Sequence, residues 1–212
     1  MDRESLYDLV RNEGGFALSN EVLKKFLSKG SQKILNKEEY LIKPGEVDKS
    51  LWITESGITK AVINEGNKEY VVGFSGPGTI TMSPISQILG KPAFCGFQTI
   101  TYCRMIKIEN EDFVNLMEES HEFALWMYGV LMHQLCALEL KSRNLSEGDA
   151  MTNFKHIVKR QMQLDQDGFD PKRPDLLPLI SSKDLASYLG ITQSYLSNIR
   201  KAIIEEERKK MK

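Results

Sequence analysis

Apolar residues recur along this chain at two different periods, which predict helices towards both ends and β-strands between them. Over residues 4–30 the apolar positions are three and four apart, with a break at Gly14-Gly15. Over residues 33–108 short runs rich in β-branched and aromatic residues alternate with turn sequences that contain Pro and Gly. Several short strands at a spacing of about 8–12 residues are typical of a β-sandwich or barrel.

The run 97–108 is the clearest of these predicted strands. In an extended chain, side chains alternate between two faces. This alternation places Ile100, Tyr102, Ile106 and Ile108 on one face of the run. We therefore expect one continuous strand here.

Helical periodicity returns over residues 111–145, where a second and longer segment begins near Ser120, a residue that can cap it. One apolar stripe of this segment comprises Ala124, Tyr128, Leu131, Leu135 and Leu138. A neighbouring stripe comprises Phe123, Met127, Val130 and Ala137. A surface helix needs only one stripe, so this helix is expected to pack on its own domain and also on the same helix of a second subunit. Burial inside a monomer is the alternative, which a length of about 39 Å for residues 120–145 disfavours.

Residues 146–150 have the composition of a hinge, and residues 151–163 again have helical periodicity. Residues 165–178 are rich in Asp, Gly and Pro, which predicts a loop.

Residues 182–201 have the pattern of two short helices joined at Leu189-Gly190-Ile191-Thr192. Ser182 can cap the first helix and Thr192 the second, and Gly190 suits the turn. The apolar residues that would form the shared core are Leu185, Leu189, Ile191, Leu196 and Ile199. This is the helix-turn-helix pattern, in which the second helix enters the major groove of DNA.

The polar positions of this segment suit a nucleic acid. The outward positions of the second helix hold no acidic residue, and Gln and Asn pair with adenine while Ser, Tyr, Arg and Lys suit phosphates and base edges. The predicted DNA-binding residues are Lys183, Thr192, Gln193, Ser194, Tyr195, Ser197, Asn198, Arg200 and Lys201. A helical corner without functional meaning is the alternative.

Charge is distributed unevenly between the N-terminal and C-terminal parts of the chain. Residues 151–212 hold 12 basic and 8 acidic residues, and residues 1–150 hold 16 and 21, so the two parts have net charges of +4 and −5. The basic C-terminal part is a weak sign of an anionic partner.

Composition excludes several classes of protein. With 41% hydrophobic and 27% charged residues the chain is an ordinary globular sequence, and it has no apolar run long enough to span a membrane. Its three cysteines, Cys95, Cys103 and Cys136, are too few and scattered for a disulfide framework or a zinc site, so the cytoplasm is the expected compartment. No nucleophile elbow, phosphate loop or metal motif is present, so we expect no enzyme activity, no cofactor and no metal.

The order of these elements resembles that of the Crp/Fnr family of bacterial transcription regulators, over about residues 20–207. The amino-acid sequence of the helix-turn-helix resembles that of family members from Bacteroidetes. The residues that match the family are Pro44-Gly45, Gly57, Gly73-Phe74, Gly76-Pro77-Gly78, Ala186, Gly190, Leu196 and Ile199. The resemblance implies an α+β protein with an antiparallel β jelly roll of the cyclic-nucleotide-binding type over residues 1–119. It further implies a dimerisation helix and hinge over 120–147 and a DNA-binding domain over 148–212. By the same resemblance, the last strand of the jelly roll would be 99–108, and the recognition helix of the DNA-binding domain would be 192–203.

Two departures from the family matter. Relatives that bind cyclic AMP hold the ribose with Glu and the phosphate with an Arg-Ser pair, whereas this chain has Ser83 at the first place and Ala93-Phe94 at the second. Without a bidentate Arg, burial of a cyclic phosphate is costly, so we expect no useful affinity for cyclic AMP. A different, more apolar effector and no effector at all are the open alternatives. Met82, Ser83, Ala93 and Phe94 would line its pocket. The second departure is the wing that usually follows the recognition helix, which is absent or minimal here.

These observations favour a homodimeric transcription regulator that binds a palindromic operator in double-stranded DNA, with an unidentified small-molecule effector and RNA polymerase as further candidate partners. The alternative is a ligand-binding or protein-interaction module with a vestigial helix-turn-helix. Selection of bound genomic fragments would separate the two.

Overall fold

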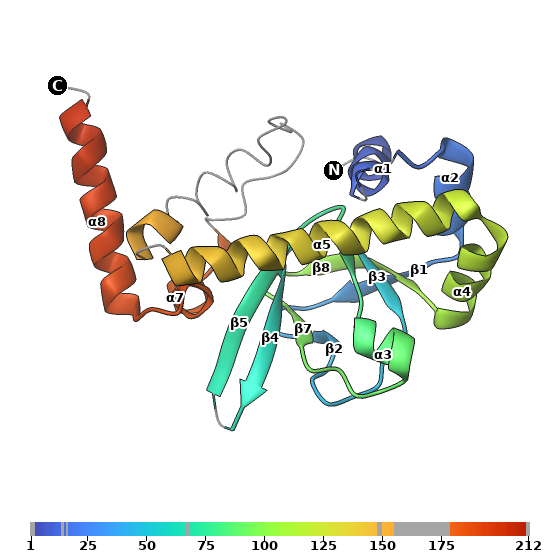
Figure 1. Cartoon of the computed structure of the whole chain (residues 1–212), viewed down its shortest axis with the longest axis horizontal. Helices are drawn as coiled ribbons and strands as arrows, with labels where there is room; N and C mark the ends of the chain where they lie inside the picture. Colours follow the sequence, from blue (N-terminus) through green and yellow to red (C-terminus); the bar gives the residue numbers. More distant parts are fainter. Residues whose placement is uncertain are drawn as a thin grey trace. The chain divides into compact units, whose positions relative to one another are not determined.

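A computed structural model describes residues 3–13, 15, 17–66, 68–147, 150–154 and 179–210. The chain divides into two compact units within helix α5 (His121–Glu147), the first ending at Leu138 and the second beginning at Glu139. Figure 1 shows the elements of both units. The predicted boundaries at 119/120 and 147/148 remain predictions.

Two antiparallel four-stranded sheets form the centre of the first unit. The first sheet has the order β1 (Ser31–Leu35), β8 (Cys103–Ile108), β3 (Leu51–Ser56) and β6 (Ile80–Thr81). The second has the order β2 (Tyr40–Ile42), β7 (Gly96–Thr99), β4 (Thr59–Glu65) and β5 (Lys68–Ser75). Non-consecutive strands are neighbours in both sheets, as in a jelly roll, and the predicted β-rich segment is confirmed.

Alternation along β3 explains how one strand serves two cores. Leu51 and Ile53 belong to a large core cluster that also contains Ile106 and Ile108 of β8. Trp52, which points to the other face, belongs to a smaller cluster with Cys103 and Met105. Because side chains alternate with a period of two, both faces of this sheet are apolar and both are covered.

Helices cover the larger cluster. They are α1 (Arg3–Asn12), α2 (Asn20–Ser28), α4 (Asn110–Glu119) and α5, and Figure 1 shows α2 and α4 beside the first half of α5. The Phe26 ring of α2 lies 4.9 Å from that of Phe123 and 5.7 Å from that of Trp126, between ring centroids. The Trp126 indole Nε1 donates a hydrogen bond of 3.0 Å to the Arg11 carbonyl. Both N-terminal helices, the break between them, and the capping of α5 by Ser120 Oγ are confirmed.

The prediction of one strand over 97–108 is wrong. Residues 96–99 form β7 in the second sheet and residues 103–108 form β8 in the first, so the chain changes sheets between them. The Ile100 amide donates to the Ile58 carbonyl at 2.8 Å, and the Ile58 amide donates to Thr101 Oγ1 at 3.0 Å. These contacts with a distant corner end the alternation, so Ile100 is buried while Tyr102 is exposed.

Gly57 lies at the same corner, with a φ of +93°. A Cβ there would lie 2.5 Å from Cys103 Sγ and 2.5 Å from the Tyr102 carbonyl oxygen. Both the positive φ and the close approach require glycine.

In the second unit, the described residues are helical at 139–147 and 150–154 and form α7 (Ser182–Leu189) and α8 (Gln193–Lys210). Ser146 and Glu147, expected in a hinge, are still helical. The predicted loop 165–178, and the predicted helix beyond residue 154, lie outside the described residues. Residues 204–210, where relatives would have the wing, continue α8 as helix.

Candidate nucleic-acid interface and effector region

Helix α7 begins with a side-chain cap. Ser181 Oγ accepts a hydrogen bond of 3.0 Å from the Asp184 amide and donates one of 2.7 Å to the Asp184 carboxylate. The cap is therefore Ser181. The sequence analysis predicted Ser182, and that prediction is wrong. Ser182 Oγ instead accepts a hydrogen bond of 3.0 Å from Arg200 Nη1. Two adjacent serines offer the same local chemistry, and only the position of the first helical turn distinguishes them.

The turn between α7 and α8 has the predicted chemistry. Gly190 has a φ of +69°, and the Ile191 amide donates to the Ala186 carbonyl at 3.0 Å. Thr192 Oγ1 accepts a hydrogen bond of 3.2 Å from the Tyr195 amide and so caps α8, as expected. The buried residues of the two helices are Leu185, Ala186, Leu189, Leu196 and Ile199, while Ile191 is half-buried.

Four residues of α8 form the face directly opposite its buried side, and we call them the α8 outer face. They are Ser194, Ser197, Asn198 and Lys201, all exposed. Positions i, i+3, i+4 and i+7 share one side of a helix, here the side away from Leu196 and Ile199. Over residues 194–201 the outer face therefore has two hydroxyls, an amide and an ammonium group, and no carboxylate. The exposed Glu205 lies on the same side, one turn beyond Lys201.

The other predicted DNA-binding residues lie around this face. Gln193, Tyr195, Thr192 and Lys183 are exposed. Arg200 is half-buried, because its guanidinium group donates to Ser182 and lies 6.0 Å from the Phe154 ring centroid. Arg200 thus also ties α8 to α7, which the sequence did not reveal because both partners are distant along the chain.

The predicted effector region surrounds the short helix α3 (Pro84–Leu89) of the first unit. Ser83 caps this helix: its buried Oγ accepts a hydrogen bond of 3.4 Å from the Ser86 amide and donates one of 3.0 Å to Ser86 Oγ. Ser86 Oγ in turn donates to the Lys91 carbonyl at 2.9 Å. These hydroxyls satisfy one another, so no donor among them is aimed at an external ligand.

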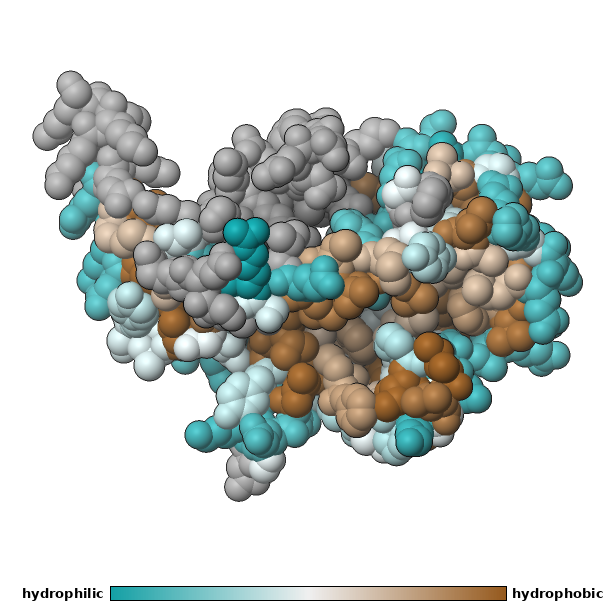
Figure 2. Space-filling view, in the orientation of Figure 1, coloured by the Kyte–Doolittle hydropathy of each residue, from teal (hydrophilic) through white to brown (hydrophobic). Residues whose placement is uncertain are grey.

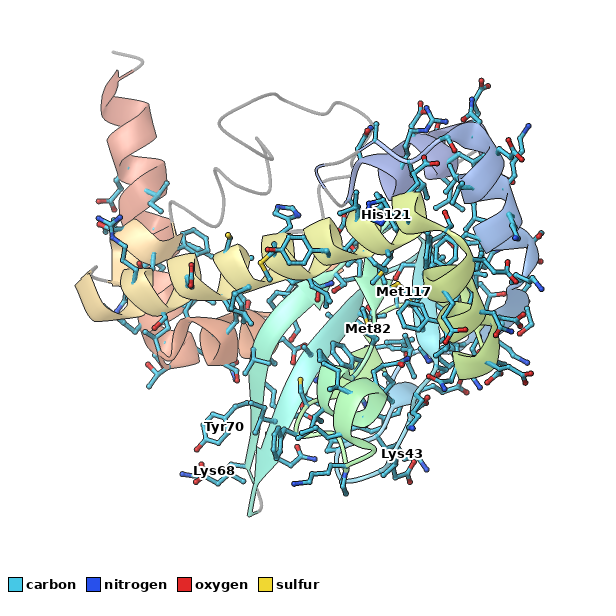
Figure 3. The ribbon with its side chains drawn as sticks, turned by 45° about the vertical axis from the view of Figure 1, so that its right-hand side comes forward. Lys43, Lys68, Tyr70, Met82, Met117 and His121 are labelled. Carbon is cyan, nitrogen blue, oxygen red and sulfur yellow. The ribbon has the colours of Figure 1, made fainter. Side chains whose placement is uncertain are left out.

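The other predicted pocket residues are not brought together. Met82 belongs to the large core cluster, and Figure 3 shows it in the interior near Met117. Ala93 is part of the smaller cluster. Phe94 lies on the surface, with 75% of its side chain exposed.

On α5, the two apolar stripes have different surroundings. Phe123, Met127 and Val130 are buried in the large cluster. In the predicted interface stripe, Tyr128, Leu135 and Leu138 are exposed, while Ala124 and Leu131 are half-buried and Leu131 packs against the cluster. The sequence analysis missed exposed Leu125 and Met132, although their spacing from Tyr128 and Leu135 is also three or four.

Other chemistry is sparse in the described part of the chain. No three His, Cys, Asp or Glu side chains there are grouped as metal ligands would be, and no described helix is long and apolar enough to cross a membrane. Burial raises the pKa of the Cys103 thiol, although hydrogen bonds with Thr101 and Ile58 oppose this shift. Cys103 is thus protonated at neutral pH and unsuited to act as a reactive thiolate.

Comparison with known proteins finds a family model that matches the β-rich part. Residues 32–120 match the family model of the cyclic nucleotide-binding domain. No curated protein sequence matches the chain.

Solved structures of Crp/Fnr-type regulators have the same fold. The regulator CLP of Xanthomonas campestris, described as c-di-GMP responsive, is 16% identical with a TM-score of 0.68, and the alignment covers 89% of this chain and 93% of that one. A CooA mutant from Carboxydothermus hydrogenoformans is 18% identical with a TM-score of 0.68, covering 89% and 87%. The catabolite activator protein of Thermus thermophilus is 16% identical with a TM-score of 0.55, covering 92% and 88%.

Proposed function

We propose that this protein is a sequence-specific DNA-binding regulator that acts as a homodimer, with residues 1–119 as sensor, 120–147 as dimerisation helix and hinge, and 148–212 as DNA-binding domain. One observation carries the proposal: over residues 194–201, the first part of α8, the exposed outer face has no carboxylate, and it lies next to a tight turn and a capped partner helix. A recognition helix needs this combination, because the phosphates around the major groove repel acids and the groove admits one helix.

The positions on α8 suggest a division of roles. Asn198 and Gln193 have amides that can pair with adenine, and Ser194 stands beside them near the start of the helix. Lys201 lies two turns along and suits a phosphate. Arg200 has guanidinium nitrogens beyond the one that donates to Ser182, and these can reach a phosphate as well.

The exposed stripe of α5 supports dimerisation. Leu125, Tyr128, Met132 and Leu135 recur three and four residues apart on a helix whose opposite face is already buried. Exposed apolar stripes at this spacing are typical of helices that pair about a two-fold axis. Two α8 helices in one dimer would then contact two half-sites of a palindrome.

The effector proposed for this domain is not cyclic AMP. Ser83 and Ala93-Phe94 stand where binders have Glu and Arg-Ser, and the Ser83 hydroxyl is engaged with Ser86. A buried phosphate would find no guanidinium fork to neutralise it. A more apolar effector, or regulation without one, is consistent with this arrangement.

Selection of genomic fragments by the full-length protein tests the proposal. We expect saturable binding to selected fragments at a dissociation constant of about 10⁻⁸ M and much weaker binding to random DNA. The variant Ser194→Ala/Asn198→Ala/Lys201→Ala should lose this preference. A control variant with three exposed substitutions in and next to β1, Gln32→Ala/Lys33→Ala/Lys37→Ala, should keep it. Equal affinity of the wild type for selected and random DNA would contradict sequence-specific binding.

A further inference from the structure

Helix α3 is closed towards the interior and apolar towards solvent. Its inner side is occupied by the hydrogen bonds among Ser83, Ser86 and the Lys91 carbonyl. Its outer side exposes 77% of Ile88 and 61% of Leu89, and Phe94 beyond it is 75% exposed. A helix that holds a ligand would be expected to have free hydrogen-bonding groups on its inner side and polar residues on its outer side.

These apolar side chains form one surface with a neighbouring segment. The Ala93 amide donates to the Glu46 carbonyl at 2.9 Å, and the Gly45 amide donates to the Ala93 carbonyl at 2.8 Å. Gln87 Nε2 donates to the Lys49 carbonyl. Residues 45–49 therefore run beside α3 and add the exposed side chain of Val47. Figure 2 shows the apolar side chains gathered over α3.

We call this surface the α3 patch, which consists of Val47, Ile88, Leu89 and Phe94 with Lys49 and Lys91. Single exposed apolar residues are ordinary, but a contiguous group of large ones marks an interaction surface. Covering Leu, Ile or Phe side chains removes apolar surface from water, so a partner would gain affinity from such a group.

The α3 patch has two lysines, Lys49 and Lys91, on a part of the chain whose net charge is negative. A Cβ at Gly90 would meet Lys49 Nζ at 3.9 Å, and Lys91 follows Gly90 directly. Neither lysine forms an ion pair with an acid in the described part of the chain. Of the two acids in the segment 45–49, Glu46 pairs with Lys43 at 3.6 Å, and Asp48 accepts hydrogen bonds from Ser50 while keeping its negative charge. Figure 3 shows Lys43 on the same side of the domain as α3.

We propose that the α3 patch docks an acidic amphipathic helix of a protein partner. An apolar stripe on such a helix would cover Ile88, Leu89 and Phe94, with the Phe94 ring as the largest anchor. Glu or Asp residues beside the stripe would face Lys49 and Lys91. Pairs of this kind at a rim add little affinity but decide which helix binds. The proposal is independent of DNA binding, because it uses no residue of α7 or α8.

Two designed peptides test the proposal with the full-length protein. Each is an Ala-rich helix of about 18 residues with the same Leu stripe; one has Glu at the flanking positions and the other Lys. Fluorescence anisotropy of the labelled peptides measures binding. We expect the Glu peptide to bind saturably and at least about tenfold tighter than the Lys peptide, a difference of about 1.4 kcal/mol.

Variants of the protein locate the binding site. Ile88→Ser/Phe94→Ser should weaken binding of the Glu peptide at least tenfold. Ile34→Ser/Tyr102→Ser, a control with two exposed apolar residues elsewhere, should leave it unchanged. Lys49→Glu/Lys91→Glu should reverse the preference between the two peptides. All variants should keep the wild-type thermal unfolding curve and DNA affinity.

Any one of four results would overturn the proposal. One is no saturable binding of the Glu peptide up to about 1 mM, or equal binding of both peptides. Another is binding of the wild type to phosphatidylglycerol vesicles that Ile88→Ser/Phe94→Ser abolishes, which would assign the patch to a lipid surface. The last is self-association in sedimentation that the same variant abolishes, which would assign it to a second copy of the chain.

Discussion

At the scale of single residues, a comparison of Gly57 with Gly45 separates the cost of a positive φ from the cost of a close contact. Gly57→Ala meets both an unfavourable positive φ and contacts of 2.5 Å with Cys103 Sγ and the Tyr102 carbonyl. Gly45→Ala meets only the first, because its φ is +82° and nothing lies within 4 Å of the added Cβ. We expect Gly45→Ala to lower the free energy of unfolding by about 1 kcal/mol and Gly57→Ala by about 1–3 kcal/mol more. Urea denaturation of both variants measures the difference, and equal losses would show that the contact is relieved without cost.

Asn198 and Lys201 share the α8 outer face and are expected to differ in what they contact. Asn198→Ala should cost about 1–3 kcal/mol on the operator and relax the preference at one base pair in each half-site, because an amide pairs with an adenine edge. Lys201→Ala should weaken operator and random DNA alike and reduce the salt slope by about 1, because an ammonium group neutralises a phosphate. Matched salt titrations on both DNAs provide the measurement. If Asn198→Ala weakens both DNAs equally, Asn198 positions the helix and does not contact a base.

At the scale of elements, the outer stripe of α5 can be tested without disturbing the core. Tyr128 and Leu135 are exposed, whereas Leu131 also packs against the large cluster, so substitution of Leu131 would mix two effects. We expect Tyr128→Glu/Leu135→Glu to give a monomer in sedimentation, because four charges would meet in an apolar seam. His133→Glu, at an exposed position on another side of the helix, should remain a dimer. A dimeric double variant would refute the interface.

Helix α3 provides a second prediction at this scale. The buried Ser83 and Ser86 hydroxyls bond to each other, and Ala93 provides no cation. We therefore expect titration calorimetry with cyclic AMP to show no binding at micromolar concentrations, because the phosphate would lose its hydration without gaining a guanidinium fork. A dissociation constant in the micromolar range or tighter would contradict this expectation.

At the scale of the whole molecule, dimer symmetry sets the operator. Two recognition helices related by a two-fold axis lie about 34 Å apart, so the half-sites of an imperfect palindrome should be about 10–11 base pairs apart, with A·T pairs among the contacted positions. Insertion of half a helical turn between the half-sites should abolish high-affinity binding, since the second half-site then faces away. Gel-shift titrations of the two operators provide the comparison. Unchanged affinity after the insertion would mean that one subunit binds alone.

The sequence by itself determined those features that depend on neighbours within a few residues. The α5 periodicity, the turn at Gly190, the capping by Thr192 and the alternation of short strands with turns all follow local rules, and the structure confirms each. The exposed outer face of α8, acid-free over residues 194–201, also follows, because the helical period and the positions of Leu196 and Ile199 define it.

Tertiary structure decided the features that depend on residues far apart in the chain. Residues 97–108 become two strands because Ile58 and Gly57 form a corner against residues 100–103. Arg200 is partly committed to Ser182, and Phe94 lies in solvent while Ala93 beside it is buried. A periodic pattern shows which side chains share a face, but burial depends on which distant element covers that face. Helix α5 is an example: its two apolar stripes have the same local pattern, but one is covered by the core and the other is exposed.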